Sequence, residues 1–468
     1  MDTVSPPLIP NADKRMDNFL GMFLPAKRFP FFQGISNEPI SSYYIPGGKI
    51  VHNLADYELI DEMLKNVDDA YVHSQFTKDT SLAFLGTSLF MSDGPGRKPQ
   101  REALVHHTQA MNIIHNKDGL RKICRETIAQ WSKKPQINLA TETKKLSLQL
   151  NSTMIWSQRL GWFLKWGIPA VFQTSAFLII GTLINKLKYH KKRRYRWLRW
   201  VLTPLRVFEL PFWITWWMVF ARLIFGVWKR RRLMAHNPAA VPSDMLTDLI
   251  KMADKPHVKE MIKRGEMGKN VVPYNVSMLF IASMTSATGM GMMPLVLKYH
   301  PEYHEKYIQE LRETQGQERP KRPVFKAIKA ATEAQFEAAH SFQRDAAKDT
   351  VLGGKYRIGK GDWIIAHKGV MHRKIVKDGQ GEILKIGRYL PGDADYDKEA
   401  AEKHATLVFG GWDTRCIGEF LNGMSSDIYM EELYLNNNVE IVSDTPLEPT
   451  DALLVEANKN IVAQISPL

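Results

Sequence analysis

The chain has 468 residues, 44% hydrophobic and 24% charged, and this ordinary globular composition excludes an intrinsically disordered protein. Its two cysteines exclude a disulfide framework and any zinc site built from several cysteines. The net charge of +14 indicates an anionic partner, and the two candidates are a membrane surface and a nucleic acid.

Residues 1–40 read as an N-terminal extension, and residues 41–468 as a single domain. The apolar run Phe19 to Leu24 is too short for a signal peptide or a membrane span, so we expect no anchor ahead of the domain. Residues 55–66 have helical periodicity, and the turn cluster Ser92 to Gly96 is typical of the start of a further helix.

The segment 160–232 is basic and aromatic. Between Lys186 and Arg232 there are fourteen lysines and arginines and one acid, Glu209, so this stretch carries a net charge of +13. Tryptophans and long cations suit the headgroup zone of a bilayer. Two long runs with few charges flank the cations, which favours an anionic membrane surface over a nucleic acid.

Two arrangements of this segment on a membrane stay open. Each apolar run approaches the roughly 20 residues of a membrane span, so a spanning hairpin at residues 167–228 is possible. Pro169 interrupts the first run, and Pro211 and Arg222 interrupt the second, which favours docking on the surface. In either arrangement we expect a membrane-associated protein with its catalytic domain in the cytoplasm.

The later elements indicate a mainly α fold with a small β region. Residues 276–299 form a long apolar helix candidate with Pro294 inside it, and His300-Pro301 ends that helix. Residues 353–365 read as short strands around glycine turns. A polar stretch at residues 397–402 then leads into the apolar run 407–409.

The strongest chemical signal is a glycine-rich loop that ends in a cysteine, Phe409-Gly410-Gly411-Trp412-Asp413-Thr414-Arg415-Cys416-Ile417-Gly418. A helix is expected from Glu419, and a thiol at a helix N-terminus is favoured as the thiolate. Gly418 lets the backbone approach a flat ligand closely. From chemistry alone Cys416 is a candidate thiolate ligand, and the alternative is a buried structural cysteine.

This loop resembles the haem-binding loop of the cytochrome P-450 family. Phe409, Cys416 and Gly418 match the family positions, whereas Trp412 stands at a usual glycine and Thr414 at a usual arginine or histidine. The resemblance implies a cytochrome P-450-like fold and haem b on Cys416. It also implies haem contacts by Phe409 and Gly418, with Arg415 taking over a propionate contact.

Four further segments extend the resemblance. Arg97 and Arg101 match propionate-binding cations at the start of the family's C-helix, and Arg344 matches a further one. The run Lys348 to Gly354 is similar to the family's strand region, and later landmarks follow at His372-Arg373 and Arg388-Tyr389-Leu390. Residues 276–299 resemble the I-helix, which implies that Thr285 and Ser286 are the catalytic hydroxyls.

Two more positions depart from the family. Met284 stands where the I-helix acid precedes the threonine, and methionine cannot relay a proton. Ala331 and Ala334 occupy the positions of the K-helix Glu-x-x-Arg pair. Because both members of that buried ion pair are missing, apolar packing can replace it at little cost in stability.

The resemblance implies a haem-thiolate monooxygenase that oxidises a lipophilic small molecule, with electrons from an NAD(P)H-dependent reductase or a ferredoxin. The first alternative is a haem-thiolate isomerase or dehydratase of an oxidised lipid, which needs no external electrons. The second is a non-catalytic haem- or lipid-binding membrane protein. We expect an anionic membrane surface as a partner of residues 160–232, and no nucleic acid.

Overall fold

The computed structural model describes residues 3–23, 25–46, 48–157, 161, 167–168, 170–171, 209–317, 321–336, 339, 341–375, 384–447 and 460–468. Its contacts divide the chain into two compact units. Unit 1 comprises residues 1–72, 113–146 and 285–468, and unit 2 comprises residues 73–112 and 147–284. Most of the segment 160–208, with its central cations, lies outside the described residues.

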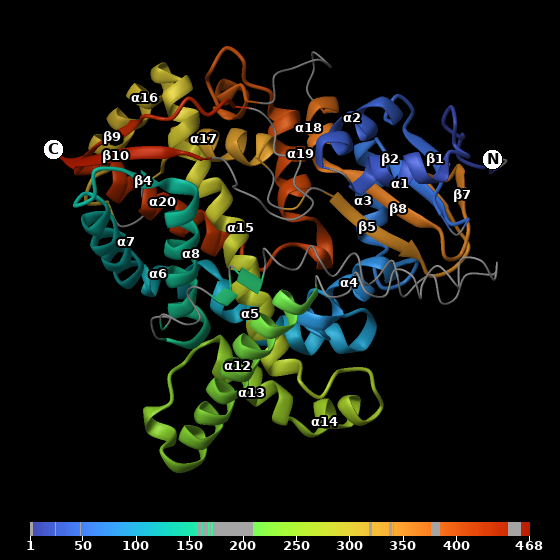
Figure 1. Cartoon of the computed structure of the whole chain (residues 1–468), viewed down its shortest axis with the longest axis horizontal. Coiled ribbons are helices and arrows are strands. Elements are labelled where there is room, and N and C mark those ends of the chain that lie inside the picture. Colours follow the sequence, from blue (N-terminus) through green and yellow to red (C-terminus); the bar gives the residue numbers. More distant parts are fainter. Residues whose placement is uncertain are drawn as a thin grey trace. The chain divides into compact units, whose positions relative to one another are not determined.

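Unit 1 contains a mixed sheet in the order β1-β2-β8-β5-β3. Its strands are β1 (Ile40–Tyr44), β2 (Ile50–Leu54), β8 (Trp363–His367), β5 (Ser341–Ala346) and β3 (Tyr71–His73). β1 pairs antiparallel with β2, β2 parallel with β8, and β8 antiparallel with β5, so strands from opposite ends of the sequence lie side by side (Figure 1). The first residues join the same unit, because Leu8 bridges to Ser42 and Val4 to Tyr356.

The helix α3 (Tyr57–Lys65) packs its apolar side against this sheet. Asp56 caps its N-terminus by accepting a hydrogen bond from the backbone N–H of Leu59 at 3.0 Å. The side chains expected on one face of the helix are the buried ones, Leu59, Ile60, Met63 and Leu64. They join a core with β1, β2 and β8, and the polar face of α3 is left outward.

The other helices that lie wholly within unit 1 come from both halves of the sequence. They are α1 (Arg15–Phe23), α2 (Pro25–Ile35), α7 (Lys117–Trp131), α16 (Pro301–Glu313), α17 (Pro323–Gln335), α18 (Lys368–Lys374), α19 (Lys398–Phe409) and α20 (Glu419–Leu435). The remaining strands are β6 (Thr350–Leu352) and β7 (Tyr356–Ile358), which pair with each other, and β4 (Ile137–Asn138), β10 (Val462–Pro467) and β9 (Asn437–Ile441) in that sheet order.

A buried ion network fixes α20. Arg121 of α7 donates to Glu431 at 2.5 Å, and Arg322 donates to Asp427 and Glu431 at 2.7 and 2.9 Å. Burial alone would raise the pKa of Glu431, but the hydrogen bonds from the two arginines hold that pKa below its usual value. The middle of α20 is therefore anchored through ion pairs to α7 and to the residue that precedes α17.

Unit 2 is helical. It contains α4 (Gln75–Leu85), α5 (Arg97–Thr108), α12 (Leu210–His236), α13 (Met245–Asp254) and α14 (Pro256–Lys263). Three helices have residues in both units, namely α6 (Ala110–His115), α8 (Leu139–Trp156) and α15 (Val271–Tyr299). α15 is the expected long apolar helix: it contains Pro294, ends before His300-Pro301 as predicted, and begins five residues earlier than expected.

The expected fold class is confirmed, since helices dominate and the strands form small sheets. The turn cluster before residue 97 forms a short 3-10 turn (Gly94–Gly96) that leads into α5, as predicted. The short strands expected over residues 353–365 are present as β7 and the start of β8, and β6 lies just before that range. The boundary at residue 40 and the single domain that follows it stay predictions.

Candidate active site

The loop around Cys416 joins α19 to α20. Asp397 caps α19 by accepting a hydrogen bond from the Ala400 N–H at 3.1 Å, and α19 ends at Phe409 because Gly410 turns the backbone left-handed, at φ +73°. The N–H of Cys416 donates to the Phe409 carbonyl at 2.7 Å and closes the loop. The Cys416 thiol is exposed, as a ligand to an external group must be.

Trp412 adopts a left-handed backbone conformation at the position where the resembling family has glycine. Its φ is +53°, which costs an L-residue about 1–2 kcal/mol. Two side chains of α3 hold it: the indole N–H donates to Asp61 at 2.9 Å, and the Lys65 ammonium lies 4.6 Å from the ring centroid. The tight turn that glycine usually makes is thus retained, and contacts to α3, which is far away in the sequence, stabilise it.

Arg415 and Gly418 flank the thiol. Arg415 makes a two-point ion pair with Glu419, the first residue of α20, with both N···O distances at 2.7 Å. Its expected propionate contact stays a prediction. A side chain at residue 418 would begin 3.8 Å from the Cys416 sulfur, so glycine there leaves the space over the sulfur open.

Cys124 is unsuited to be the ligand. It is buried in α7, and burial, with the negative charge of Glu432 nearby, raises the pKa of its thiol well above the ordinary value. A thiol held protonated in a closed interior neither reaches a ligand nor binds a metal ion. Cys416 is therefore the chemically suitable cysteine.

One face of α15 is lined by small, accessible residues. Ala282 is exposed, Thr285 and Ser286 are half-buried, and a β-carbon built at Gly289 would meet no atom within 4 Å. Met284 faces the other way and is only 1% exposed. The two expected catalytic hydroxyls therefore lie on the open face of the helix, whereas the position of the family acid lies in the interior.

The expected propionate cations are distributed over the two units. In unit 1, Arg344 is half-buried on β5 and donates to the Gln343 carbonyl at 2.8 Å. In unit 2, Arg97 is buried in the first turn of α5 and Arg101 follows one turn later, half-buried. Within unit 2 the start of α5 is fixed by Gln100, whose amide oxygen accepts from Asn275 of α15 at 2.6 Å.

The K-helix positions Ala331 and Ala334 are buried in α17. Apolar packing was expected to replace the missing ion pair, and the structure shows a polar replacement as well. His372 and His404 lie on α18 and α19, which both contact α17, and their ring nitrogens are 3.2 Å apart. Burial, together with the cation of Lys368, lowers the pKa of His372 to about 3, so the pair is uncharged at neutral pH.

The residues of unit 1 fit haem. An exposed sulfur stands at the N-terminus of a 17-residue helix with open space above it. The accessible face of α15 carries small side chains, which leave room for a flat macrocycle. Arg344 supplies a cation of the kind that binds carboxylates.

A second feature lies in unit 2, on α12. The side of this helix toward the protein is buried, but its opposite side exposes large apolar residues: Leu210, Ile214, Trp217, Met218, Ile224, Phe225 and Trp228. In the part of the chain that the structure describes, α12 and α15 are long and apolar enough to cross a membrane, judged by length and composition. The most apolar window of α15 is 72% buried, as in a core helix, whereas that of α12 is 33% buried.

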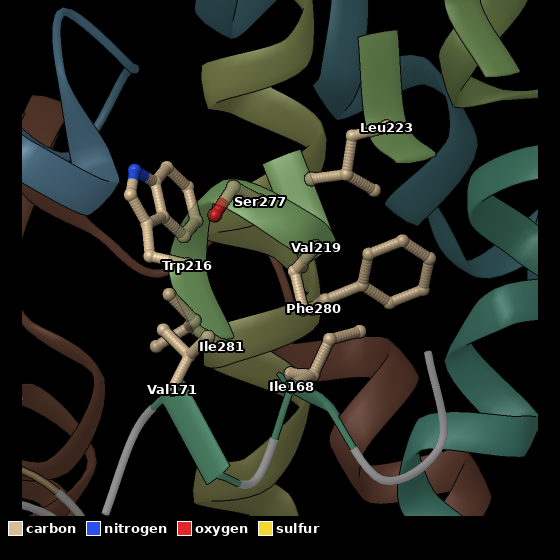
Figure 2. A pocket seen from close by; sticks show the side chains of 8 residues that line it. All are labelled: Ile168, Val171, Trp216, Val219, Leu223, Ser277, Phe280 and Ile281. Carbon is tan, nitrogen blue, oxygen red and sulfur yellow. The ribbon is translucent and has the colours of Figure 1, made fainter. Parts of the chain in front are cut away.

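A small apolar cavity lies behind α12 (Figure 2). It has room for about one water molecule, and Ser277 brings one hydroxyl to its lining. The other lining residues are Trp216, Val219 and Leu223 of α12, Phe280 and Ile281 of α15, and Ile168 and Val171.

Sequence reasoning missed the side chains that contact the Cys416 loop and its flanks, namely Asp61 and Lys65 of α3 and Lys329 and Glu333 of α17. The signal available was the i,i+4 spacing of opposite charges within each pair, which indicates helix-surface ion pairs. Nothing in that spacing connects either pair to a loop far along the chain.

A protein-family model and two solved structures match this chain over most of its length. The protein-family model described as "Cytochrome P450" matches residues 37–464. Among solved structures, the cytochrome P450DA heme domain matches with a TM-score of 0.74 at 15% identity, covering 100% of this chain and 99% of that chain. A triple mutant of the same domain matches with a TM-score of 0.73 at 14% identity, covering 100% and 98%. No curated protein sequence matches significantly.

Proposed function

We propose that this chain, which belongs to the cytochrome P-450 family, oxidises a lipophilic small molecule at a membrane surface. As a member of that family it is a haem-thiolate monooxygenase with haem b as its cofactor. The observation that carries the proposal is the exposed Cys416 thiol in the loop between α19 and α20. Membership in the family also implies a redox partner, an NAD(P)H-dependent reductase or a ferredoxin.

We assign the cofactor contacts as follows. Cys416 is the metal ligand, and Phe409 and Gly418 shape its loop. Haem supplies the oxygen chemistry when bound, and a thiolate ligand favours cleavage of the O–O bond. We assign the propionates to cations at the family positions, namely Arg97, Arg101 and Arg344, or to Arg415, which also pairs with Glu419.

Thr285 and Ser286 hold protons on the distal side. Both residues lie on the accessible face of α15, and a hydroxyl group can both donate and accept a hydrogen bond. General acid help of this kind is worth about 10²–10⁴-fold in rate. Because Met284 offers no carboxyl group, protons must be supplied through the two hydroxyls and water. We therefore expect turnover that is slow and that releases peroxide.

An absorbance spectrum tests the ligand. The reduced carbon monoxide complex should show the red-shifted Soret band of thiolate ligation, and Cys416→Ala should abolish it. Arg344→Ala should weaken haem retention, whereas the control Arg357→Ala, on β7 and bonded to Thr3, should not. A folded protein that takes up no haem would refute the proposal.

The exposed side of α12 supports the membrane part. Ile214, Trp217, Ile224 and Trp228 follow helical spacing on that side, and Trp217 is 62% exposed. A helix with one apolar side packed on its own protein and one apolar side exposed suits the boundary between headgroups and acyl chains. Packing of the inner side supports docking on the surface over the spanning hairpin at residues 167–228.

Three arginines of α12 lie in two different environments. Arg230 is buried and donates to Asp244 at 2.6 Å, so it serves the protein interior. Arg222 and Arg232 lie over the exposed rings of Phe225 and Trp228, at 5.6 and 5.5 Å from the ring centroids. Cations beside exposed aromatic rings suit an anionic headgroup layer, at about 1 kcal/mol for each cation.

Vesicle binding tests this surface. The protein should bind anionic vesicles better than neutral ones, and salt should weaken the attraction. Trp217→Ser should reduce binding, whereas the control Phe90→Ser, at an exposed aromatic elsewhere in unit 2, should not. Neutralising Lys191 to Arg194, outside the described residues, should also reduce binding. Equal binding to both vesicle types would refute the electrostatic part, and resistance to alkaline extraction would favour the hairpin.

The exposed apolar side of α12 also supports a lipophilic substrate, because a surface that enters the boundary between headgroups and acyl chains places the protein where lipophilic molecules collect.

One observation favours a second candidate, a haem-thiolate isomerase or dehydratase of an oxidised lipid. Residue 284 is a buried methionine, and methionine has no carboxyl group, so the helix has no acid at the position where a monooxygenase of this family has one. Incubation with candidate lipophiles, NADPH and a reductase, beside lipid hydroperoxides without reductant, separates the two. Product only in the second mixture would refute the monooxygenase, and product in neither would favour the non-catalytic alternative.

A further inference from the structure

We infer that Lys329 and Glu333 are positioning residues that hold the two flanks of the Cys416 loop in place. The inference deepens the proposed function, because it rests on Cys416 being the ligand. The pair lies on α17, within the stretch where the family's Glu-x-x-Arg pair is absent.

The geometry joins one ion pair to both ends of the loop. The Lys329 ammonium lies 2.5 Å from the Glu333 carboxylate and 5.0 Å from the centroid of the Phe409 ring. The same Glu333 oxygen accepts a hydrogen bond from the Asn422 amide at 3.0 Å. Phe409 ends α19 and Asn422 belongs to the first turns of α20, so Cys416 lies between the two contacts.

The burial of the pair makes these contacts matter. The Lys329 and Glu333 side chains are 13% and 15% exposed, so water replaces little of what either would lose. When one member of a mostly buried ion pair is removed, the other is left uncompensated and moves toward solvent. Movement of Lys329 or Glu333 would release Phe409 or Asn422, and therefore one end of the loop.

An ordinary helix-surface ion pair would behave differently. Lys398 and Glu402 on α19 have the same i,i+4 spacing, but they lie 3.8 Å apart and are 75% and 69% exposed. Exposed pairs contribute little to stability, and among the described residues neither side chain of this pair bonds to the loop. It is the matched control for charge and spacing.

The test combines two measurements on the full chain. The first is hydrogen exchange of the amides of residues 410–418 in protein without haem. The second is the fraction of thiolate-type Soret band in the reduced carbon monoxide complex. Lys329→Met and Glu333→Ala should each speed exchange by at least about tenfold and lower the thiolate fraction, whereas Lys398→Met should change neither.

Conservative variants distinguish positioning from a general loss of folding. Lys329→Arg keeps the cation over Phe409 and should restore both readouts. Glu333→Gln keeps an acceptor for Asn422 and should lie between wild type and Glu333→Ala. Unchanged exchange and spectrum in Lys329→Met and Glu333→Ala would overturn the inference, as would lower thermal stability with an unchanged loop. A wild type without the thiolate band would refute the ligand instead, because exchange is measured without haem.

Discussion

Trp412 gives a prediction in which glycine should be a better replacement than alanine. The residue has φ +53°, and alanine would keep this conformation at a cost of about 1–2 kcal/mol, which glycine avoids. Both replacements lose the hydrogen bond to Asp61 and the Lys65 contact. The difference between the two variants therefore isolates the backbone strain.

The magnitudes follow from these contacts. A hydrogen bond to a charged group contributes about 1.5–3 kcal/mol when well shielded, and an exposed cation–π contact about 0.5–1 kcal/mol. Because Trp412 is 58% exposed, we take the lower ends, for a total of about 2 kcal/mol. Trp412→Ala should thus lose about 2 kcal/mol of loop stability, and Trp412→Gly about 1 kcal/mol or less.

Hydrogen exchange of two loop amides measures this stability. The N–H groups of Arg415 and Cys416 bond to carbonyls within the loop, at 3.1 and 2.7 Å, so they exchange only when it opens. Since 1.4 kcal/mol is a factor of ten, exchange should rise about 30-fold in Trp412→Ala and about fivefold in Trp412→Gly. Asp68, also left-handed at φ +73°, is the control, because Asp68→Gly should leave these amides unchanged. Faster exchange in glycine than in alanine would refute the strain at Trp412.

Three other outcomes are expected. Stability should fall as the pH drops below about 6.5, because a histidine with a lowered folded pKa is neutral in both states above that pH and is protonated first in the unfolded chain below it. With the His372 pKa at about 3, the loss by pH 5 is about 2 kcal/mol in urea unfolding, and His372→Leu should flatten this slope. In protein without haem, Met284→Glu should lower the melting temperature, because a carboxyl group would be buried there, whereas Ala282→Glu, at an exposed position of the same helix, should be tolerated. Arg322→Met should destabilise the fold by about 3–5 kcal/mol in the same urea assay, because Asp427 and Glu431 would lose their buried partner.

The sequence predicted elements whose signals are local. α3 was predicted from its apolar periodicity, and α15 from its length and the His300-Pro301 end. β1 and β2 were missed because their interior is polar: Ser42 and His52 are buried and bond to each other at 2.8 Å. A strand that buries polar residues between apolar ones shows no regular hydrophobic alternation, so the pattern that identifies strands is absent.

For the site, the residue types were predictable and their supports were not. Cys416 and its loop were identified from a short motif. The contact between Trp412 and Asp61 joins residues 351 positions apart, which no local pattern indicates. The His372–His404 pair likewise depends on packing of α18 and α19, which becomes visible only in three dimensions.

The two cysteines differ in reactivity, and this difference provides a measure of how many molecules carry the cofactor. Cys416 is exposed, whereas Cys124 is buried with a raised thiol pKa, so an alkylating probe should modify Cys416 first in the folded chain. A metal-bound sulfur does not react in this way. The fraction of chains that carry one label, measured by mass spectrometry, would therefore equal the fraction of molecules that lack cofactor. Labelling of Cys124 after denaturation would serve as the internal standard for complete reaction.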